Sequence, residues 1–344
     1  MVSLLDITET EATLLDGDDL VSAPSVQDLF ADLSEGQRAV ALLLPASLVR
    51  ARQIEVDVPL SAGAPLLITH THVNAALETL RHAAEGPGTA CLYCAPLGFA
   101  LDGRRGHFDP VGQRASALTV NAVTLSVSLK ALMPLERQIK AAGGTLVDSV
   151  TPHLAVTALI PSAQDGAAVH IGHNATVVSV LAHGQLVATG TARIGARHFI
   201  GDVMKAFDLT ATQARPLVDQ FFDPDSSGPL DELTEKVIRA RLEEWAEHCA
   251  AILVSALMVS DITLSGMYAD QPVLRDRFRK TLMATKNGSQ PRIIEGAASR
   301  RPLLHGAAAV LKGEGPIAPQ GATFTLAPSQ SRGRQVIDWI QAHF

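Results

Sequence analysis

The sequence predicts an α/β chain made of two similar halves with a cleft between them. It has 344 residues, which suits one large domain or two. Hydrophobic residues make up 47% of the chain but aromatic residues only 4%, so aliphatic side chains must form the core. Such a core is typical of buried strands covered by helices. Strand, hairpin and helix patterns occur in the same order at the start and at the centre of the chain, which indicates an internal duplication.

The first half alternates short apolar runs with helical patterns. Residues 118–128 alternate between apolar and polar side chains, as a half-buried strand does. Residues 132–142 form an amphipathic pattern that stops at Gly143 and Gly144, so we expect a helix there. Further strands are predicted at 3–7, 12–15, 40–44, 54–58 and 91–94, and further helices at 26–33 and 73–84, the latter capped by Thr71.

The second half repeats the opening pattern and then becomes helical. Strands are predicted at 167–171, 176–181 and 184–191, with a tight turn between the last two. Long helical patterns cover 211–222 and 230–257, and a strand at 262–264 precedes a helix ending near residue 283. Residues 313–331 are rich in Gly, Pro and Ser and indicate a linker before a last short helix.

Charge, cysteine content and hydropathy exclude several classes of protein. The net charge of −7 argues against general nucleic-acid binding, which needs Lys and Arg to neutralise phosphates. Three cysteines cannot form a disulfide framework and indicate a reducing compartment, so we expect a cytoplasmic protein. We find no signal-peptide pattern and no apolar run near the ~20 residues of a spanning helix. Any membrane contact is therefore expected to be peripheral.

Two short motifs have a functional and a structural interpretation. His170-Ile171-Gly172-His173 spells a signature of class I aminoacyl-tRNA synthetases, but a strand pattern follows it instead of a helix. As a metal pair, the two histidines lack a third ligand nearby. Cys91 and Cys94 form a Cys-x-x-Cys within a strand pattern, where residues i and i+3 face opposite sides, so we expect buried structural cysteines.

Two other patterns resemble metal sites but have a simpler structural interpretation. The loop from Asp223 to Asp231 has carboxylates and a glycine at calcium-loop spacing, but Thr234 stands where a closing glutamate is required. We therefore expect an interdomain turn there. His70-Thr71-His72 stands where a helix begins, and we interpret it as an exposed approach to the helix cap.

One group of motifs resembles a known family. The stretch 95–103, the turn Asp109-Pro110-Val111-Gly112 and the strand from Leu118 are similar, in that order, to the inserted subdomain of the bacterial cell-division protein FtsA. Gly184-Gln185-Leu186, Ile194-Gly195 and a helix at 199–207 continue the resemblance over most of the chain. The resemblance implies an actin-like two-lobed α/β fold, made of duplicated RNase H-like domains, with an FtsA-type inserted subdomain.

The resemblance also implies a domain plan. Other actin-like proteins lack the inserted subdomain, so its motif is fairly specific. The implied parts are a first lobe at 1–46 and 126–165, the inserted subdomain at 47–125, a second lobe at 166–312 with a helical subdomain at about 206–259, a linker at 313–331 and a C-terminal amphipathic helix at 332–344.

The family's ATP site, with its Mg²⁺, is altered here. This chain retains Asp6 of the family's first phosphate hairpin, but Glu9 adds a negative charge where phosphates would bind. Of the second hairpin Gly172 and Thr176 are kept, while His170 replaces a carboxylate and His173 and Asn174 replace glycines. Ser265 and Gly266 remain from an adenosine loop, and the ribose-binding segment falls on residues 214–218, where Pro216 is expected to fit only a first helical turn. We interpret Asp6, Gly172, Thr176, Ser265 and Gly266 as a remnant ATP site without hydrolysis.

The C-terminal residues have an amphipathic pattern. At 100° per residue, Val336, Ile337, Trp339, Ile340 and Phe344 fall in one arc about 160° wide. The arc is similar to the amphipathic helix that ends FtsA, which implies contact with a membrane surface. The alternative is a final helix packed on the body of the protein.

The function that these features predict is non-enzymatic. The family is an actin-fold ATPase that tethers division-ring filaments to the membrane. We therefore expect a divergent, FtsA-like peripheral scaffold at the inner face of the cell membrane, which self-associates and organises division-ring or cytoskeletal proteins without ATP turnover. An actin-fold phosphotransferase or ATPase that uses Asp6 is one alternative, and an actin-like scaffold for pilus assembly is another.

Overall fold

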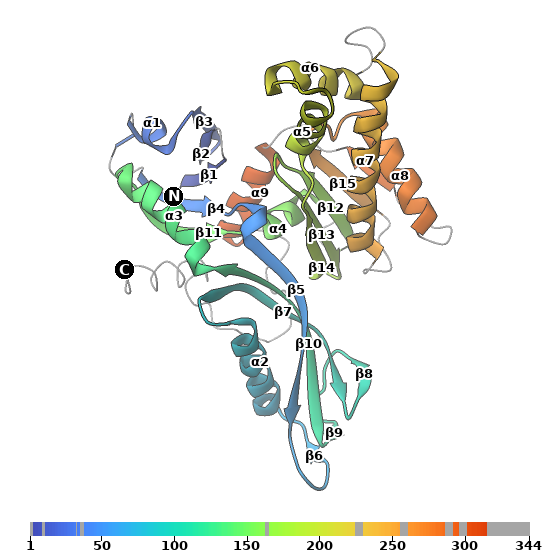
Figure 1. Cartoon of the computed structure of the whole chain (residues 1–344). Coiled ribbons are helices and arrows are strands. Elements are labelled where there is room, and N and C mark those ends of the chain that lie inside the picture. The colour runs from blue at the N-terminus through green and yellow to red at the C-terminus, as the bar shows by residue number, and fades with distance from the viewer. Residues whose placement is uncertain are drawn as a thin grey trace. The chain divides into compact units, whose positions relative to one another are not determined.

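The computed structural model describes residues 3–8, 11–31, 33–34, 38–161, 165–223, 230–254, 261–285, 292–295 and 301–314. The chain forms two compact units, each described by itself below. Unit 1 contains residues up to Thr151 together with Gln185–Val187, and unit 2 contains Pro152–Gly184 and the chain from Ala188 onward to Ile317. Figure 1 shows the elements of both units with the labels used from here on.

Unit 1 begins with a five-stranded mixed sheet. β1 (Ser3–Ile7) is buried along its whole length and lies at the centre, antiparallel to β2 (Ala12–Asp16) and parallel to β4 (Ala39–Leu43). β3 (Asp19–Ala23) and β11 (Thr145–Val150) form the two edges. Helices α1 (Val26–Ala31) and α3 (Leu129–Ala141) contact each other and the sheet. The close packing has no room for a side chain at Gly144, whose Cβ would lie 2.2 Å from the Phe30 ring.

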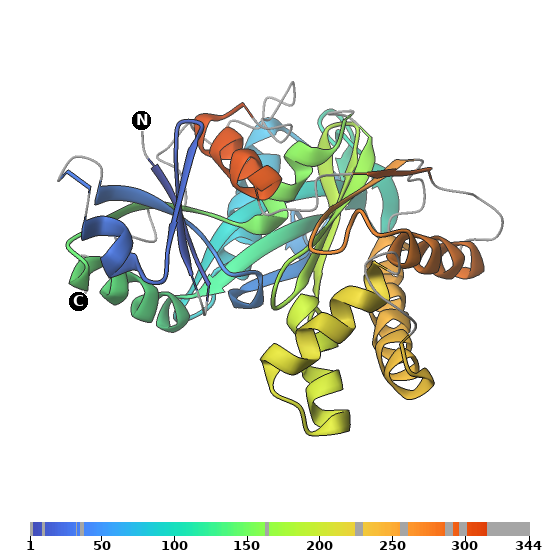
Figure 2. The ribbon, with the colours of Figure 1, turned by 90° about the horizontal axis from the view of Figure 1, so that it is seen from above.

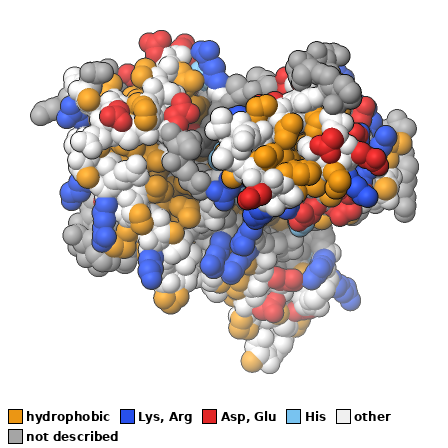
Figure 3. Space-filling model, turned by 45° about the horizontal axis from the view of Figure 1, so that its top comes forward, with side chains coloured by type: hydrophobic (Ala, Val, Ile, Leu, Met, Phe, Trp, Pro, Cys, Tyr) orange, Lys and Arg blue, Asp and Glu red, His pale blue; other side chains and the backbone are white. Residues whose placement is uncertain are grey.

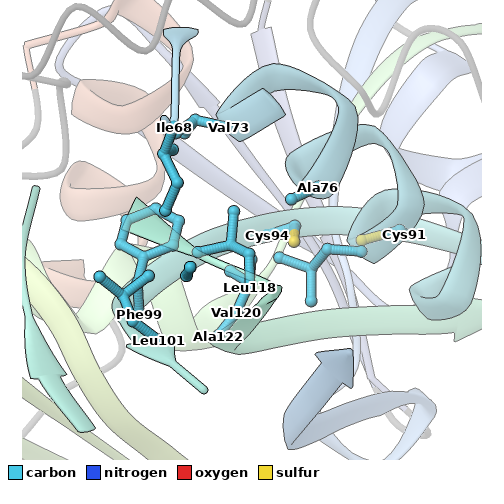
Figure 4. Packing of buried hydrophobic residues seen from close by; sticks show 12 residues of the cluster. Ile68, Val73, Ala76, Cys91, Cys94, Phe99, Leu101, Leu118, Val120 and Ala122 are labelled. Carbon is cyan, nitrogen blue, oxygen red and sulfur yellow. The ribbon is translucent and has the colours of Figure 1, made fainter. Parts of the chain in front are cut away.

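A second sheet in unit 1 is inserted after β4. Its order is β5 (Val49–Pro59), β10 (Ala117–Ser128), β7 (Thr89–Leu101) and β8 (Arg104–His107), all antiparallel. Helix α2 (His70–Ala84) covers one face, where Val73, Ala76 and Leu80 pack on the apolar side chains of the strands (Figure 4). A short 3-10 turn at Ala46–Leu48 leads into the sheet, and β6 (Leu66–Leu67) pairs with β9 (Arg114–Ala115) beside it.

The inserted sheet corrects two expectations from the sequence. Thr69, and not Thr71, caps α2, because the backbone N–H of Thr69 donates to Nδ1 of His72 and the histidines lie in the first turn. Cys91 and Cys94 face the same side, beneath α2, and not opposite sides (Figure 4). The reason is a β-bulge at Leu92, which has no Cα partner on β10 and shifts the alternation by one residue. Both cysteines are buried, as expected, and their sulfur atoms are not joined in a disulfide.

Unit 2 repeats the topology of the first sheet. β12 (Gly166–Ile171) is central, antiparallel to β13 (Thr176–Ala182) and parallel to β15 (Asp261–Gly266), and β14 (Gln185–Ala192) and β16 (Arg292–Glu295) form the edges. β12 therefore corresponds to β1, β13 to β2, and β15 to β4. This repetition confirms the predicted duplication.

Helices cover both faces of the second sheet. On one face lie α4 (Pro152–Ala155), a 3-10 turn at Val156–Leu159, and α9 (Arg301–Lys312), and α7 (Glu232–Val254) contacts the other (Figure 2). The two faces are distinguished by β13, since Ser179 bonds to α4 while Thr176, three residues earlier, bonds to α7. α5 (Ala196–Phe207), α6 (Ala211–Phe222) and α8 (Pro272–Thr285) pack with α7.

Two expectations about α6 and the loop after it were wrong. Pro216 is the sixth residue of α6 and does not stand in its first turn. Its missing N–H would have bonded to the carbonyl of Thr212, which is an exposed residue. The loop after Asp223 lies within unit 2 and is not an interdomain turn. Asp231 at its end caps α7, accepting the N–H groups of Leu233 and Thr234, while residues 224–229 lie outside the described residues.

The surface shows no large single-sign field on the face seen in Figure 3, where acidic, basic and apolar side chains are interspersed. Among the described residues, no helix is long and apolar enough to cross a membrane. The predicted C-terminal helix and its apolar arc lie outside the described residues, as does most of the predicted linker.

Candidate functional site

Four of the five residues of the predicted remnant site lie together in unit 2. Gly172 and Thr176 flank the β12–β13 turn, and Ser265 and Gly266 end β15, where they pair with His170 and Ile171 of β12. Asp6, the fifth residue, lies in unit 1 near the end of β1, where it is 2% exposed. In the repeated topology, Asp6-Ile7 corresponds to His170-Ile171.

The β12–β13 turn is a tight four-residue connection. The N–H of Gly172 donates to the carbonyl of Ala175 at 3.0 Å, and a Cβ at Gly172 would lie 2.9 Å from that oxygen. Gly172 is therefore required for the turn itself, and no ligand is needed to explain it.

The hydroxyl of Thr176 is fully engaged inside the protein. It donates to the carbonyl of Ile194 at 2.7 Å and accepts the indole N–H of Trp245 at 2.9 Å. Thr176 and Trp245 are both 0% exposed. The hydroxyl thus links β13 to α7 and to the segment before α5, and it is not directed at solvent.

His170 and Ser265 form a buried polar pair across two parallel strands. His170 Nδ1 and Ser265 Oγ lie 3.0 Å apart, and the residues are 2% and 1% exposed. The hydrogen bond gives each of these two buried polar side chains a partner. The position that holds the Asp6 carboxylate in unit 1 holds the His170 imidazole here, paired with Ser265.

The first backbone N–H groups of α5 are hydrogen-bonded to the same turn. The N–H groups of Ala196 and Arg197 donate to the carbonyls of Gly172 and His173, both at 3.0 Å. At the cap residue Gly195, a Cβ would lie 2.5 Å from the backbone nitrogen of Ala175. The backbone of the helix cap therefore packs directly on the backbone of the turn. The first helical amides, which are the groups that bind anions at helix N-termini, are therefore already bonded within the chain.

The loop after β15 is tied to α6 by aromatic contacts. Gly266 has φ +90°, and its Cβ would lie 2.3 Å from the Ile171 carbonyl, which accepts the N–H of Met267. Tyr268 stacks on Phe222 with centroids 4.2 Å apart and donates its hydroxyl to Asp219 at 2.9 Å. Burial, together with Asp219, raises the pKa of Tyr268, so the phenol remains a donor.

In unit 1, the turn that corresponds to Gly172–Ala175 runs from Thr8 to Glu11. The N–H and the hydroxyl of Thr8 both donate to the carbonyl of Glu11, at 2.8 Å each, and the hydroxyl accepts the N–H of Glu11 at 2.9 Å. Glu9 lies outside the described residues. No cluster of His, Cys, Asp or Glu suited to a metal ion occurs in the described part of the chain.

Sequence reasoning missed the groups that hold this region. Trp245 lies 69 residues from Thr176 along the chain, and Tyr268 lies 49 residues from Asp219. The rarity of tryptophan and tyrosine in this chain, with two of each, was the one available signal. A buried aromatic side chain with a polar atom requires a partner, although sequence alone does not identify it.

Comparison with known proteins identifies relatives of the inserted sheet and of the fold. Residues 47–126 match the family described as the SHS2 domain inserted in FtsA. The cell division protein FtsA of Rhizobium meliloti (strain 1021) is 26% identical over 264 residues, which covers 75% of this chain and 55% of that protein. FtsA of Agrobacterium fabrum (strain C58 / ATCC 33970) is 27% identical over 184 residues, 46% of this chain and 42% of that protein.

A solved structure extends the similarity to nearly the whole chain. The PilM-PilN type IV pilus biogenesis complex has a chain that aligns with a TM-score of 0.60 at 15% identity, covering 91% of this chain and 98% of that one. At this identity the likeness shows the fold alone, which is actin-like. This chain spans about half the length of the curated relatives that it matches. It is thus similar to FtsA in sequence, and its fold is actin-like with the inserted domain.

Proposed function

We propose that this FtsA-like chain of actin-like fold is a scaffold that ties cell-division or cytoskeletal partners to a membrane surface without turning over ATP. The observation that carries the proposal is the bonding of the α5 N-terminus to the β12–β13 turn. The first backbone amides of a helix bind anions only when they are free, and the amides of Ala196 and Arg197, the first two of α5, already have partners at 3.0 Å.

The side chains around that turn support the same proposal. The Thr176 hydroxyl already has two partners, and His170 pairs with Ser265 where a carboxylate would hold Mg²⁺ through water. An imidazole is a poor ligand for Mg²⁺, which prefers oxygen ligands in octahedral geometry. We therefore propose that ATP and Mg²⁺ are not used for hydrolysis, even where nucleotide binding is retained.

Calorimetric titration of the full chain with ATP and Mg²⁺, combined with steady-state phosphate release, tests this proposal. We expect phosphate release at the level of a buffer blank, unchanged in Asp6→Ala. Phosphate release that is above the blank and disappears in Asp6→Ala would instead favour the actin-fold phosphotransferase or ATPase. Binding heat without release would restrict the proposal to lost hydrolysis.

The membrane part of the proposal rests on the C-terminal arc of Val336, Ile337, Trp339, Ile340 and Phe344. Apolar burial at the interface contributes about 1.5–3 kcal/mol per side chain before ordering costs. The net charge of the tail is small, so we expect weak binding by a monomer and firm binding by linked copies. We therefore propose that the protein lies at the inner face of the cell membrane.

Co-sedimentation with anionic vesicles tests the tail with a matched pair of variants. Trp339→Glu places a charge inside the arc, while Gln341→Glu places the same charge outside it. We expect the wild type and Gln341→Glu to pellet with vesicles and Trp339→Glu to stay in the supernatant. Equal pelleting of both variants, with equal unfolding temperatures, would show that the tail is not the anchor.

Self-association completes the proposed scaffold, because FtsA relatives are expected to stack their subunits head to tail. Light scattering and electron microscopy on an anionic lipid layer should show assemblies that depend on protein concentration and not on added nucleotide. Monomers at all concentrations would contradict this part. The match over residues 47–126 supports the proposed inserted subdomain at 47–125.

A scaffold for pilus assembly is the second candidate, and the fold likeness to the PilM-PilN chain favours it. Depleting the protein in its host and observing septa and surface pili distinguishes the two candidates. Filamentous cells with normal pili support a division role, whereas normal division with lost pili supports the pilus role.

A further inference from the structure

The outer strand of the first sheet, β3, is open along one edge. It pairs with β2 alone, and no strand of the described residues pairs with its other edge (Figure 1). Four of its five residues are exposed. Two of these, Leu20 and Val21, are apolar and are 41% and 52% exposed. An open edge that carries apolar side chains is a place where another strand can extend a sheet.

The counterpart of β3 in unit 2 is covered. β14 has the same place in the repeated topology, yet Gln185 is its only exposed residue out of eight. Its side chains Thr189 and Thr191 bond to Ser179 of β13 and to His153 of α4. The exposure of β3 is therefore a feature of this strand and not of the repeated fold.

The turn before β3 shows which of its backbone groups point to the open edge. Asp16 and Asp19 lie directly opposite each other, and Gly17 and Asp18 connect them. Gly17 has φ +63°, which suits the first central position of a two-residue hairpin turn. The pair that flanks such a turn is hydrogen-bonded, and bonded and non-bonded pairs then alternate along antiparallel strands.

This alternation directs four backbone groups away from β2. Asp19, Val21 and Ala23 occupy the bonded positions, counted from the turn. Leu20 and Ser22 lie between them, so their N–H and C=O groups point to the open edge. An added strand can therefore form four hydrogen bonds with β3.

We infer that β3 pairs antiparallel with β3 of a second copy of this chain, about a two-fold axis at Val21. In this register Leu20 of each copy exchanges two hydrogen bonds with Ser22 of the other, so all four outward groups are used. The two Val21 residues face each other as a non-bonded pair, with Cα atoms about 4.5 Å apart, and their exposed side chains pack together. The contact is the same on both copies and closes as a dimer.

The residues at the two ends of β3 select this register. Moving the axis one residue toward the turn places Ser22 opposite Asp18, which lies in the turn and outside the strand. Moving it one residue the other way places Leu20 opposite Pro24, which lies beyond the strand and has no N–H to donate. The strand is thus complementary to its own copy when the axis passes through Val21.

Charge also favours a second copy in this register. Asp19 is the one charged residue of β3, and it lies opposite Ala23 of the second copy. The two Asp19 carboxylates are then four residue positions apart, about 13 Å along the strands. This separation exceeds the Debye length of about 8 Å at physiological ionic strength, so their repulsion is largely screened.

Two strands of five residues bury less area than the roughly 1,200–2,000 Å² of a stable interface, so we expect a weak dimer that forms at high local concentration. This closed two-fold contact differs from the head-to-tail stacking proposed above, which is open-ended. The inference does not depend on that stacking, on the nucleotide-site residues or on the C-terminal tail.

Cysteine cross-linking of the full chain tests the pairing. Val21→Cys would place two thiols on Cα atoms about 4.5 Å apart, within the range of about 4.4–6.8 Å found for disulfides. We expect diamide to convert this variant into a covalent dimer at least tenfold faster than Leu233→Cys, which changes an exposed residue of unit 2. The three natural cysteines are buried, so the wild type should remain a single chain on a non-reducing gel.

A mixture of two variants tests the register. Asp19→Cys alone and Ala23→Cys alone should cross-link no faster than Leu233→Cys, because each thiol would lie about 13 Å from its own copy. Mixed in equal amounts, with a size tag on one of them, they should form the mixed dimer at least fivefold faster than either forms its own dimer.

Thermal unfolding of each variant establishes that it is folded before oxidation. The inference is wrong if folded Val21→Cys cross-links no faster than Leu233→Cys, since the edge of β3 would then be left to a different partner. It is also overturned if Asp19→Cys alone cross-links as fast as the mixture, because the two strands would then not pair about Val21.

Discussion

The β1–β2 hairpin of unit 1 and the β12–β13 hairpin of unit 2 have the same topology and the same turn length, yet they are held in different ways. The first is closed by one threonine side chain, Thr8, which bonds both backbone groups of Glu11. The second has Gly172 at that position and is held by contacts from outside the hairpin, through α5 and Trp245. Duplication preserved the backbone, while the surroundings determine what each turn can bind.

The largest expected effect comes from Gly195→Ala, which separates the second turn from α5. The new Cβ would meet the Ala175 nitrogen and the Gly172 and His173 carbonyls at 2.5–2.6 Å, all of them backbone atoms. We expect a loss of about 3 kcal/mol in the free energy of unfolding. Urea unfolding measures it.

The matched control for that variant is Gly201→Ala in the same helix, where nothing lies within 4 Å of the new Cβ. It should raise the free energy of unfolding by roughly 0.5–1 kcal/mol, because alanine favours a helix. Equal effects of the two variants would mean that the α5 contact does not hold the turn.

Thr176→Val removes the hydroxyl that links the second hairpin to α7. The Ile194 carbonyl and the Trp245 indole N–H would both be left buried without a partner, for a loss of roughly 2–3 kcal/mol. Thr13→Val on the first hairpin, where the hydroxyl and Ser22 are exposed, should change stability by less than about 0.5 kcal/mol. A smaller loss for Thr176→Val than for Thr13→Val would contradict the contrast between the hairpins.

As the pH falls, we expect the stability of unit 2 to decrease at a higher pH than the stability of unit 1. Both buried histidines of the described residues, His153 and His170, lie in unit 2. Burial lowers the pKa of His153 to about 3, so the unfolded chain binds more protons at this position from about pH 6.5 downward. The contribution of His153 to stability is thus complete above pH 6.5 and decreases as the pH falls toward 3.

Between pH 6.5 and 5 the free energy of unfolding is expected to fall by about 1.6 kcal/mol, because the slope rises from half of about 1.4 kcal/mol per pH unit toward the full value. Hydrogen exchange followed by mass spectrometry at pH 6.5 and 5, corrected for intrinsic rates, should show faster opening in β13 and β14 than in β1 and β2. Uniform acceleration in both units would refute the role of His153.

Apart from the control variants, the smallest effect is expected from Thr8→Val in the first hairpin. Its bonds to Glu11 are exposed, so losing them should cost about 0.5–1 kcal/mol. A loss as large as that of Thr176→Val would show that the two turns are held with similar strength after all. Urea unfolding under the same conditions allows the direct comparison.

Much of the fold could be predicted because it depends on local periodicity. The strand around 118–128 follows from alternation, and the helix at 211–222 follows from helical spacing. The buried strands around 3–7 and 167–171 follow from short apolar runs next to turn residues. The repeated order of strands gave the duplication. The resemblance to FtsA added the inserted sheet, which composition alone does not reveal.

The parts that could not be predicted depend on distant neighbours. The bulge at Leu92 arises from the register between β7 and β10. The side of the sheet to which Cys91 and Cys94 point could therefore not be predicted from their spacing in the sequence. The partner of Thr176 lies on α7, and the amides of α5 are bonded by a turn more than 20 residues earlier. Single-sequence reasoning therefore located the altered residues of the nucleotide site but not the contacts that occupy it.

The long strand β10 has a consequence for how the chain is made. Every residue of β5 pairs with β10, and β7 pairs with β10 on the other side. Of these three strands, β10 is the last to leave the ribosome. At about 5–20 residues per second, β5 waits several seconds as an unpaired strand. Its charged side chains Arg52, Glu55 and Asp57 would keep that waiting strand soluble, since charged residues discourage pairing between nascent chains.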